Sequence, residues 1–61
     1  MTPIEFFIER RSGAFVLADA NGDLHVPARF ADEATALLMA VRFAQDQNAL
    51  YSIYYGDSAQ Q

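Results

Sequence analysis

The chain contains no cysteine, which excludes a disulfide staple and a thiolate metal site. It also has no lysine, so its four positive charges are all arginines. No apolar run comes near the roughly 18 residues of a membrane-spanning helix. No basic segment followed by an apolar run, the pattern of a signal peptide, stands near Met1. These absences predict a soluble protein, and the missing cysteines fit a reducing cytoplasm.

Negative charge is in excess. Eight acidic residues against four basic ones give a formal net charge of −4. An acidic surface repels phosphate, which disfavours direct binding to nucleic acid. The same surface would attract a basic partner protein. The alternative is that the acids only keep the protein in solution.

The length of 61 residues allows one domain at most. A chain of this size buries only about 60 % of its unfolded surface, so its core is thin. Five phenylalanines and three tyrosines supply large buried areas per residue and partly offset the small size. We predict a single α+β domain over residues 1–57, followed by a flexible polar tail over residues 58–61.

The strand pattern recurs in short segments bounded by turn residues. The predicted strands cover residues 4–9, 14–20, 24–26 and 49–55. Asn21-Gly22 is a strong signal for a type I′ hairpin turn, and Pro27 would end the third strand.

Two-residue turns at Ser12-Gly13 and Asn21-Gly22 would fix the register, with Ile8 opposite Leu17 and Leu17 opposite Val26. One sheet face is then apolar, and the other is expected to stay open. The apolar face would hold Ile4, Phe6, Ile8, Phe15, Leu17, Leu24, Val26 and Ile53. The open face would hold Glu5, Phe7, Glu9, Val16, Ala18, Asp23, His25, Ser52 and Tyr54.

A helix is predicted over residues 33–47, with Asp32 as N-cap and Asn48 as a left-handed C-terminal cap. Its expected core stripe consists of Ala34, Leu37, Leu38, Val41 and Ala44. A second apolar flank consists of Ala36, Met39, Ala40 and Phe43, and it would lie under residues 27–30 or pair two subunits. A right-handed crossover gives β-β-β-α-β, a mostly antiparallel four-stranded sheet in the order 3-2-1-4 with the helix on one face.

Motifs for catalysis are missing from the sequence. His25 is the single histidine and has no ligand cluster around it. Glu5 and Glu9 lie about 13 Å apart on one strand, too far for paired acid–base work. The glycines fit turns rather than a phosphate loop. We therefore predict a protein that is not an enzyme, with no cofactor and no metal.

What remains is a surface rich in acids and aromatic rings, which fits an interface for a basic partner. The candidate partner-binding residues are Glu5, Phe7, Glu9, Asp19, Asp23, Asp32, Glu33, Asp46 and Tyr54.

The segment GAFVLADANGDLHVPARFADEATALLMAVRFAQDQNALYSIYYGD resembles DUF2188-type domains in its strand, turn, strand, helix and strand order. HicB-type antitoxins share the β-β-β-α-β order and the helix opening Glu33-Ala34. By type alone, a small acidic α+β chain is similar to phage-encoded anti-CRISPR proteins. That resemblance implies a DNA-mimicking inhibitor of a Cas effector subunit in a bacterial cytoplasm.

Two hypotheses follow. The first is a non-enzymatic inhibitor, favoured as a monomer, that covers a basic nucleic-acid-binding surface of a partner protein. The alternative is a small homodimeric structural or antitoxin-like module.

Overall fold

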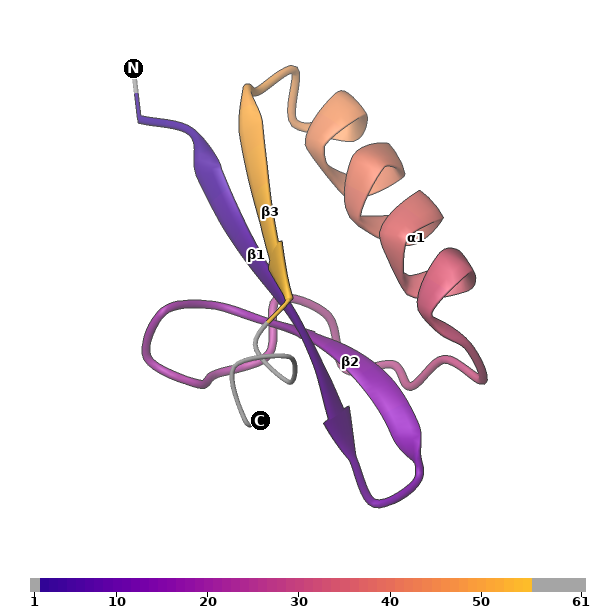
Figure 1. Ribbon diagram of the computed structural model, residues 1–61. Coiled ribbons are helices and arrows are strands. Elements are labelled where there is room, and N and C mark those ends of the chain that lie inside the picture. Colours follow the sequence, from indigo (N-terminus) through magenta and orange to yellow (C-terminus); the bar gives the residue numbers. More distant parts are fainter. Residues whose placement is uncertain (1, 56–61) are drawn as a thin grey trace.

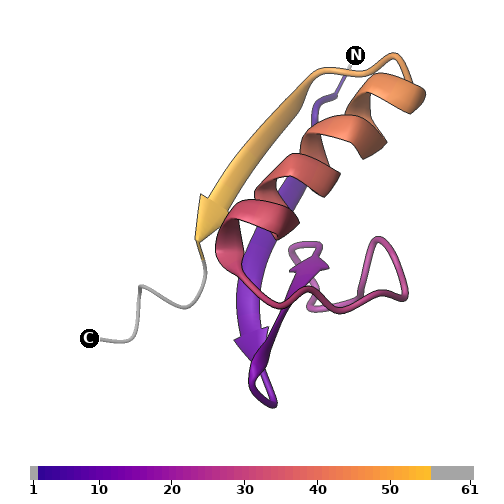
Figure 2. The same cartoon turned by 90° about the vertical axis from the view of Figure 1, so that its right-hand side faces the viewer.

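A computed structural model describes residues 2–55 as an α+β fold, in which one helix packs on one face of a three-stranded mixed sheet (Figure 1). The elements are β1 (Ile4–Arg11), β2 (Ala14–Ala18), α1 (Glu33–Asp46) and β3 (Tyr51–Tyr55). Figure 2 shows α1 lying across one face of the sheet. Within the described part of the chain, no helix is long and apolar enough to cross a membrane. The predicted tail over residues 58–61 lies outside the described residues.

The hairpin between β1 and β2 has the predicted register. Ile8 pairs with Leu17, and Arg11 pairs with Ala14 across a two-residue turn. The turn residues Ser12 and Gly13 both have positive φ, at 53° and 80°. This is the backbone that a type I′ turn requires, and it matches the twist of the two strands. The turn at Ser12-Gly13 therefore has the positive φ values of a type I′ turn.

The second turn differs from the prediction. Of its two central residues only Gly22 has positive φ, at 91°, so Asn21-Gly22 is not a type I′ turn. The Gly22 amide donates to the Asp19 carbonyl at 3.0 Å, and the Asp19 amide donates to the Asp23 carbonyl at 2.7 Å. The loop therefore has three residues, 20–22. The Asp19 carboxylate favours it by accepting the Asn21 and Asp23 amides at 2.8 and 3.0 Å.

One extra loop residue moves the following segment by one position. Leu24, not His25, lies opposite Ala18, in an isolated bridge. Leu24 is 42 % exposed, whereas it was predicted to face inward. The His25 ring lies 4.8 Å from the Phe6 ring, on the core side rather than the open face.

The predicted strand over residues 24–26 is not formed. Its place beside β2 is taken by two isolated bridges, Ala18 with Leu24 and Phe15 with Phe30. Phe15 and Phe30 exchange two backbone hydrogen bonds of 2.8 Å. The predicted order 3-2-1-4 is therefore not found, and the sheet order is β2-β1-β3.

The last strand, β3, pairs in parallel with β1, as the crossover predicted. Phe6 lies opposite Ile53 in the register, and Ile53 packs against the buried core as expected. Tyr54 lies opposite Phe7, and Ser52 opposite Glu5. The side-chain alternation of this parallel pair was thus correctly inferred.

The ends of α1 follow the sequence signals, but its buried face does not. Asp32 is the N-cap and accepts the Thr35 amide at 2.8 Å, and Asn48 has positive φ at 53°. The fully buried residues are Ala36, Ala40 and Ala44, most of which had been assigned to the second flank. Leu38, predicted in the core stripe, is 55 % exposed.

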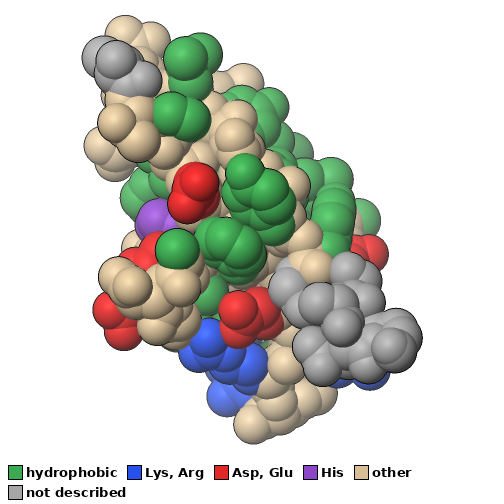
Figure 3. Space-filling model, turned by 60° about the vertical axis from the view of Figure 1, so that its left-hand side comes forward, with side chains coloured by type: hydrophobic (Ala, Val, Ile, Leu, Met, Phe, Trp, Pro, Cys, Tyr) green, Lys and Arg blue, Asp and Glu red, His purple; other side chains and the backbone are tan. Residues whose placement is uncertain are grey.

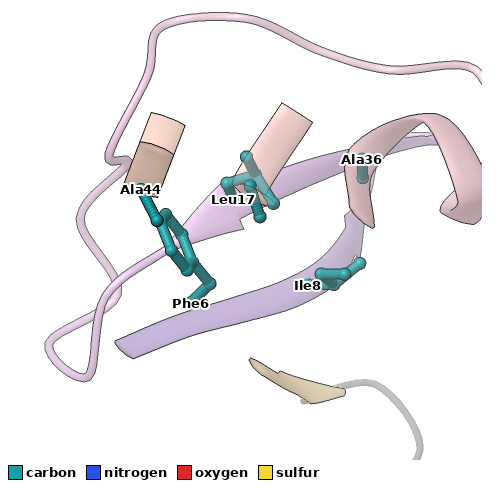
Figure 4. Packing of buried hydrophobic residues seen from close by; sticks show 6 residues of the cluster. Phe6, Ile8, Leu17, Ala36 and Ala44 are labelled. Atoms are coloured by element: carbon teal, nitrogen blue, oxygen red, sulfur yellow. The ribbon is translucent and has the colours of Figure 1, made fainter. Parts of the chain in front are cut away.

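The alanine stripe explains this rotation. Small side chains at every fourth position let the helix lie close to the sheet, and Phe6, Ile8 and Leu17 fill the space between the two layers. Figure 4 shows these three side chains and two of the alanines meeting between sheet and helix. The larger helix residues Leu37 and Phe43 flank the stripe, half-buried.

Candidate functional site: the uncovered face of the sheet

The face of the sheet opposite α1 carries a stacked pair of aromatic rings. Phe7 of β1 and Tyr54 of β3 are register partners. Their ring centroids lie 4.9 Å apart at an interplanar angle of 20°. Tyr54 is 45 % exposed, and Phe7 is half-buried. The two rings cover each other on one face, and a partner can reach the pair mainly at the exposed Tyr54 ring.

Glu5 and Glu9 share this face with Phe7, because side chains two positions apart on a strand point the same way. Glu5 is exposed and Glu9 is half-buried. Figure 3 views the side away from α1 and shows hydrophobic side chains at its centre, with acidic side chains above and below them. We name Glu5, Phe7, Glu9 and Tyr54 the ring–acid patch.

The two carboxylates of this patch differ in their partners. The Arg11 side chain donates to Glu9 Oε1 from Nε at 3.0 Å and from Nη2 at 2.7 Å. The same Nη2 donates to the Gly22 carbonyl at 2.9 Å. No described residue pairs with the Glu5 carboxylate. Among the described residues, the Glu5 carboxylate is thus available to a partner, whereas the Glu9 carboxylate is bound to Arg11, which also contacts the turn at Gly22.

Part of this face is closed. Val16 is 3 % exposed and Ala18 is not exposed, although both were predicted on an open face. The accessible area therefore lies along β1 and β3 rather than across the whole sheet.

The other predicted site residues lie on other elements of the fold. Asp19 and Asp23 are in the turn after β2, where the Asp19 carboxylate binds backbone amides. Asp32, Glu33 and Asp46 belong to α1 or its cap, in the other layer of the fold. The structure thus brings Glu5, Phe7, Glu9 and Tyr54 together on β1 and β3. Asp19 lines a surface hollow together with Glu5, whereas the three acids of α1 and its cap lie in the other layer.

Asp32 has its own electrostatic role. Hydrogen bonds from Thr35 lower the pKa of the Asp32 carboxyl below its ordinary value of 3.8. The cause is that the exposed amide at the helix start donates to the charged form. This acid is therefore explained by helix capping.

A cluster of arginines at the β1–β2 turn was not predicted. The Arg29 Nη2 donates to the carbonyls of Arg11 and Ser12 at 3.0 and 3.3 Å. The Arg10 guanidinium lies 5.5 Å from the centroid of the Phe15 ring. Arg29 is far away in sequence, so only the return of residues 24–30 along β2 brings it here. The pair Glu9 and Arg11, two apart on one strand face, was a readable signal for the ion pair.

His25 has a structural environment. Its Nε2 lies 2.7 Å from the Glu5 carbonyl oxygen, and its ring lies 4.8 Å from Phe6 and 5.8 Å from Phe43. Among residues 2–55, no group of His, Cys, Asp and Glu is arranged to hold a metal ion. His25 thus connects the segment that follows the turn at residues 20–22 to β1 and α1 through these contacts.

A hollow of about 200 Å³ lies between α1 and the segment over residues 26–30. Met39 and Phe43 line it from the helix, and Val26, Ala28 and Phe30 from the loop. Met39 and Phe43 of the predicted second flank thus face the loop, in line with the first of the two alternatives, whereas Ala36 and Ala40 of the same flank belong to the buried core.

Searches of family models, curated proteins and solved structures returned no match to this chain.

Proposed function

We propose that this chain is a non-enzymatic inhibitor that docks its ring–acid patch on a basic, nucleic-acid-binding surface of a partner protein. The observation that carries the proposal is the stack of Phe7 on Tyr54 beside the carboxylate of Glu5, which makes no ion pair with another described residue. A Cas effector subunit is one partner of this kind, by the resemblance in type to anti-CRISPR proteins.

The chemistry of the patch favours arginine over lysine in the partner. A guanidinium group is planar and stacks on aromatic faces, and it can pair with a carboxylate at the same time. Tyr54, which is 45 % exposed, offers the ring, and Glu5 offers a carboxylate on the same face of the sheet. A lysine ammonium is a compact, strongly hydrated charge and gains less from the ring.

The rings and the charges would contribute differently. An exposed ion pair contributes roughly 0.2–1 kcal/mol, and salt screens it. Aromatic anchors at the centre of an interface commonly contribute more. We therefore expect the rings to set the dissociation rate, while the net charge of −4 sets the association rate and its salt dependence.

The test uses an oligo-arginine peptide and an oligo-lysine peptide of equal length, titrated into the intact chain and followed by amide chemical shifts. We expect arginine to bind tighter by roughly threefold, which a cation–π energy of about 0.5–1 kcal/mol implies. The shifts should centre on Phe7 and Tyr54.

Glu5→Lys and its matched control Glu33→Lys separate a local site from net charge. Both positions are exposed, and both changes alter the net charge equally, but Glu33 lies on α1. Glu5→Lys should weaken arginine binding much more. Equal losses in the two variants, or equal binding of both peptides, would mean that only net charge is at work.

A further inference from the structure

The hollow of about 200 Å³ between α1 and residues 26–30 combines apolar walls with two charged side chains. Its apolar lining from both elements consists of Val26, Ala28, Phe30, Met39 and Phe43. Arg42 and Asp46 complete the lining, and both are exposed, so they stand where the hollow meets solvent. The four lining residues of α1 follow the i, i+3, i+4, i+7 spacing of one helix face.

The loop wall of the hollow is fixed to the sheet at both of its ends. The His25 amide donates to the Leu17 carbonyl at 2.8 Å. Phe30 and Phe15 exchange two backbone hydrogen bonds, also of 2.8 Å. The hollow therefore lies between two anchored elements and is formed before any ligand arrives, as small-molecule sites usually are.

The volume suits one apolar side chain. An apolar protein cavity of roughly 150 Å³ takes up benzene, so about 200 Å³ has room for one phenyl or branched aliphatic group. Met39 is 38 % exposed, and the other apolar lining residues are half-buried. An apolar group in the hollow would remove these side chains from water, which favours binding.

The two charged groups of the lining are not used by the fold. No ion pair or hydrogen bond joins the side chain of Arg42 or Asp46 to another residue in the described range 2–55. The other arginines there contact a ring, a carboxylate or backbone carbonyls, namely Arg10, Arg11 and Arg29. Arg42 and Asp46 are four positions apart, but arginine before acid is the less favourable order for such a helix pair. Two opposite charges are therefore available beside the apolar hollow.

The position of Asp46 strengthens its attraction for a cation. Asp46 is the last residue of α1, where the helix dipole has its negative end. The last turn of α1 contains no basic residue that would offset this negative potential. A ligand ammonium at Asp46 would therefore meet both the carboxylate and the dipole, while Arg42, one turn earlier, offers a guanidinium to a ligand carboxylate.

We propose that the hollow binds a free α-amino acid with an apolar side chain. The side chain fills the hollow, the carboxylate accepts from Arg42, and the ammonium pairs with Asp46. A ligand with only a carboxylate would face Asp46 and the net charge of −4, and one with only an ammonium would face Arg42. The ring–acid patch lies on the sheet face opposite α1, so this inference does not rest on the proposed function.

The experiment compares L-phenylalanine with two analogues of the same ring and chain length. Phenethylamine lacks the carboxylate, and 3-phenylpropanoate lacks the ammonium. Each compound is titrated into the intact chain and followed by NMR at the methyl group of Met39, with the exposed Leu50 outside the lining as reference. We expect phenylalanine to bind with a dissociation constant on the order of a millimolar, and each analogue roughly threefold more weakly. Net charge alone would instead favour phenethylamine.

Variants that remove one charge at a time assign the two ends of the ligand. Arg42→Gln should abolish the preference for phenylalanine over phenethylamine, and Asp46→Asn should abolish the preference over 3-phenylpropanoate. Arg10→Gln and Glu33→Gln make the same charge changes at exposed positions outside the hollow. Both control variants should keep both preferences.

Several results would overturn the inference. One is a Met39 shift no larger than that of Leu50, and another is equal or tighter binding of either analogue. Equal effects of Arg42→Gln and Arg10→Gln would show that only net charge matters. A Met39 shift that follows protein concentration without any added compound would place a second copy of the chain in the hollow instead.

Discussion

The same substitution at two leucines tests how α1 is rotated against the sheet. Leu17 is fully buried among Phe6, Ile8 and the alanine stripe, whereas Leu38 is 55 % exposed. Leu17→Ala removes three buried carbon atoms and leaves a cavity, which costs about 2–5 kcal/mol in protein cores. Leu38→Ala should stay within about 0.5 kcal/mol of zero, because it changes an exposed helix position to the best helix former.

The size of the domain makes the contrast easy to measure. At about 0.05–0.15 kcal/mol per residue, a chain of 61 residues has a free energy of unfolding of roughly 3–9 kcal/mol. Leu17→Ala would remove a large share of it, and Ile8→Val, at about 0.5–1.5 kcal/mol, is the milder core variant if Leu17→Ala does not fold.

Urea unfolding followed by circular dichroism measures both variants. We expect a clear fall of the midpoint for the core variants and an unchanged midpoint for Leu38→Ala, with similar m-values. If Leu38→Ala costs as much as the core substitutions, Leu38 is in the core and the alanine stripe is not the buried face of the helix.

Two further predictions concern the turn and the helix cap. Gly22→Val should lower the free energy of unfolding by on the order of 1–2 kcal/mol, because the backbone at Gly22 has a φ of 91°. The nearest atom to an added Cβ, on Arg11, is 3.9 Å away, so the cost is backbone strain and not a clash. An unchanged urea midpoint would contradict the positive φ. Asp32→Asn keeps a capping side chain but removes the titratable carboxyl. The pKa of Asp32 is lowered in the folded state. The stabilisation that its charge adds is therefore present above the pKa of the unfolded state and is lost as the pH falls through the pKa of the folded state. Thermal melts from neutral to acidic pH should show the advantage of the native residue shrinking below about pH 4, and a difference that grows with acid would reverse the sign.

Local signals predicted those parts of the fold that depend on neighbouring residues. The register of Ile8 with Leu17 follows from a two-residue turn, and the turn is set by Ser12 and Gly13 alone. The N-cap at Asp32 likewise depends on a hydrogen bond three residues away. The parallel pairing of β1 with β3 followed from chain reversal by one helix.

The wrong predictions arose where two local signals competed or where packing decided. Asn21-Gly22 is a good type I′ sequence, but the Asp19 carboxylate binds two amides of the loop and stabilises a turn that begins earlier. This single shift removed the predicted strand over residues 24–26 and turned His25 inward. On the helix, the leucines were predicted to face the core, whereas the buried stripe is made of alanines.

The candidate site was predicted in part for the same reasons. Glu5, Phe7 and Glu9 share a face by strand alternation, and Tyr54 joins them through the parallel pair. Neither strand alternation nor strand pairing places the acids of the turn and the helix. Which face of the molecule they occupy depends on the tertiary arrangement. The ion pair of Glu9 with Arg11 was not predicted either, although the two residues have opposite charges and lie two apart on one strand face.

The acids of this chain are therefore not equivalent as sites for a basic partner. Asp19 binds turn amides, Asp32 binds a helix amide, and Glu9 binds Arg11. Each would have to exchange an internal contact for an external one, which reduces the net gain. The Glu5 carboxylate has no described ion-pair partner to lose and stands beside the Phe7–Tyr54 stack. Counting acids thus overstates the charge available for recognition, and reversal of Glu5 should weaken a basic partner more than reversal of Glu9.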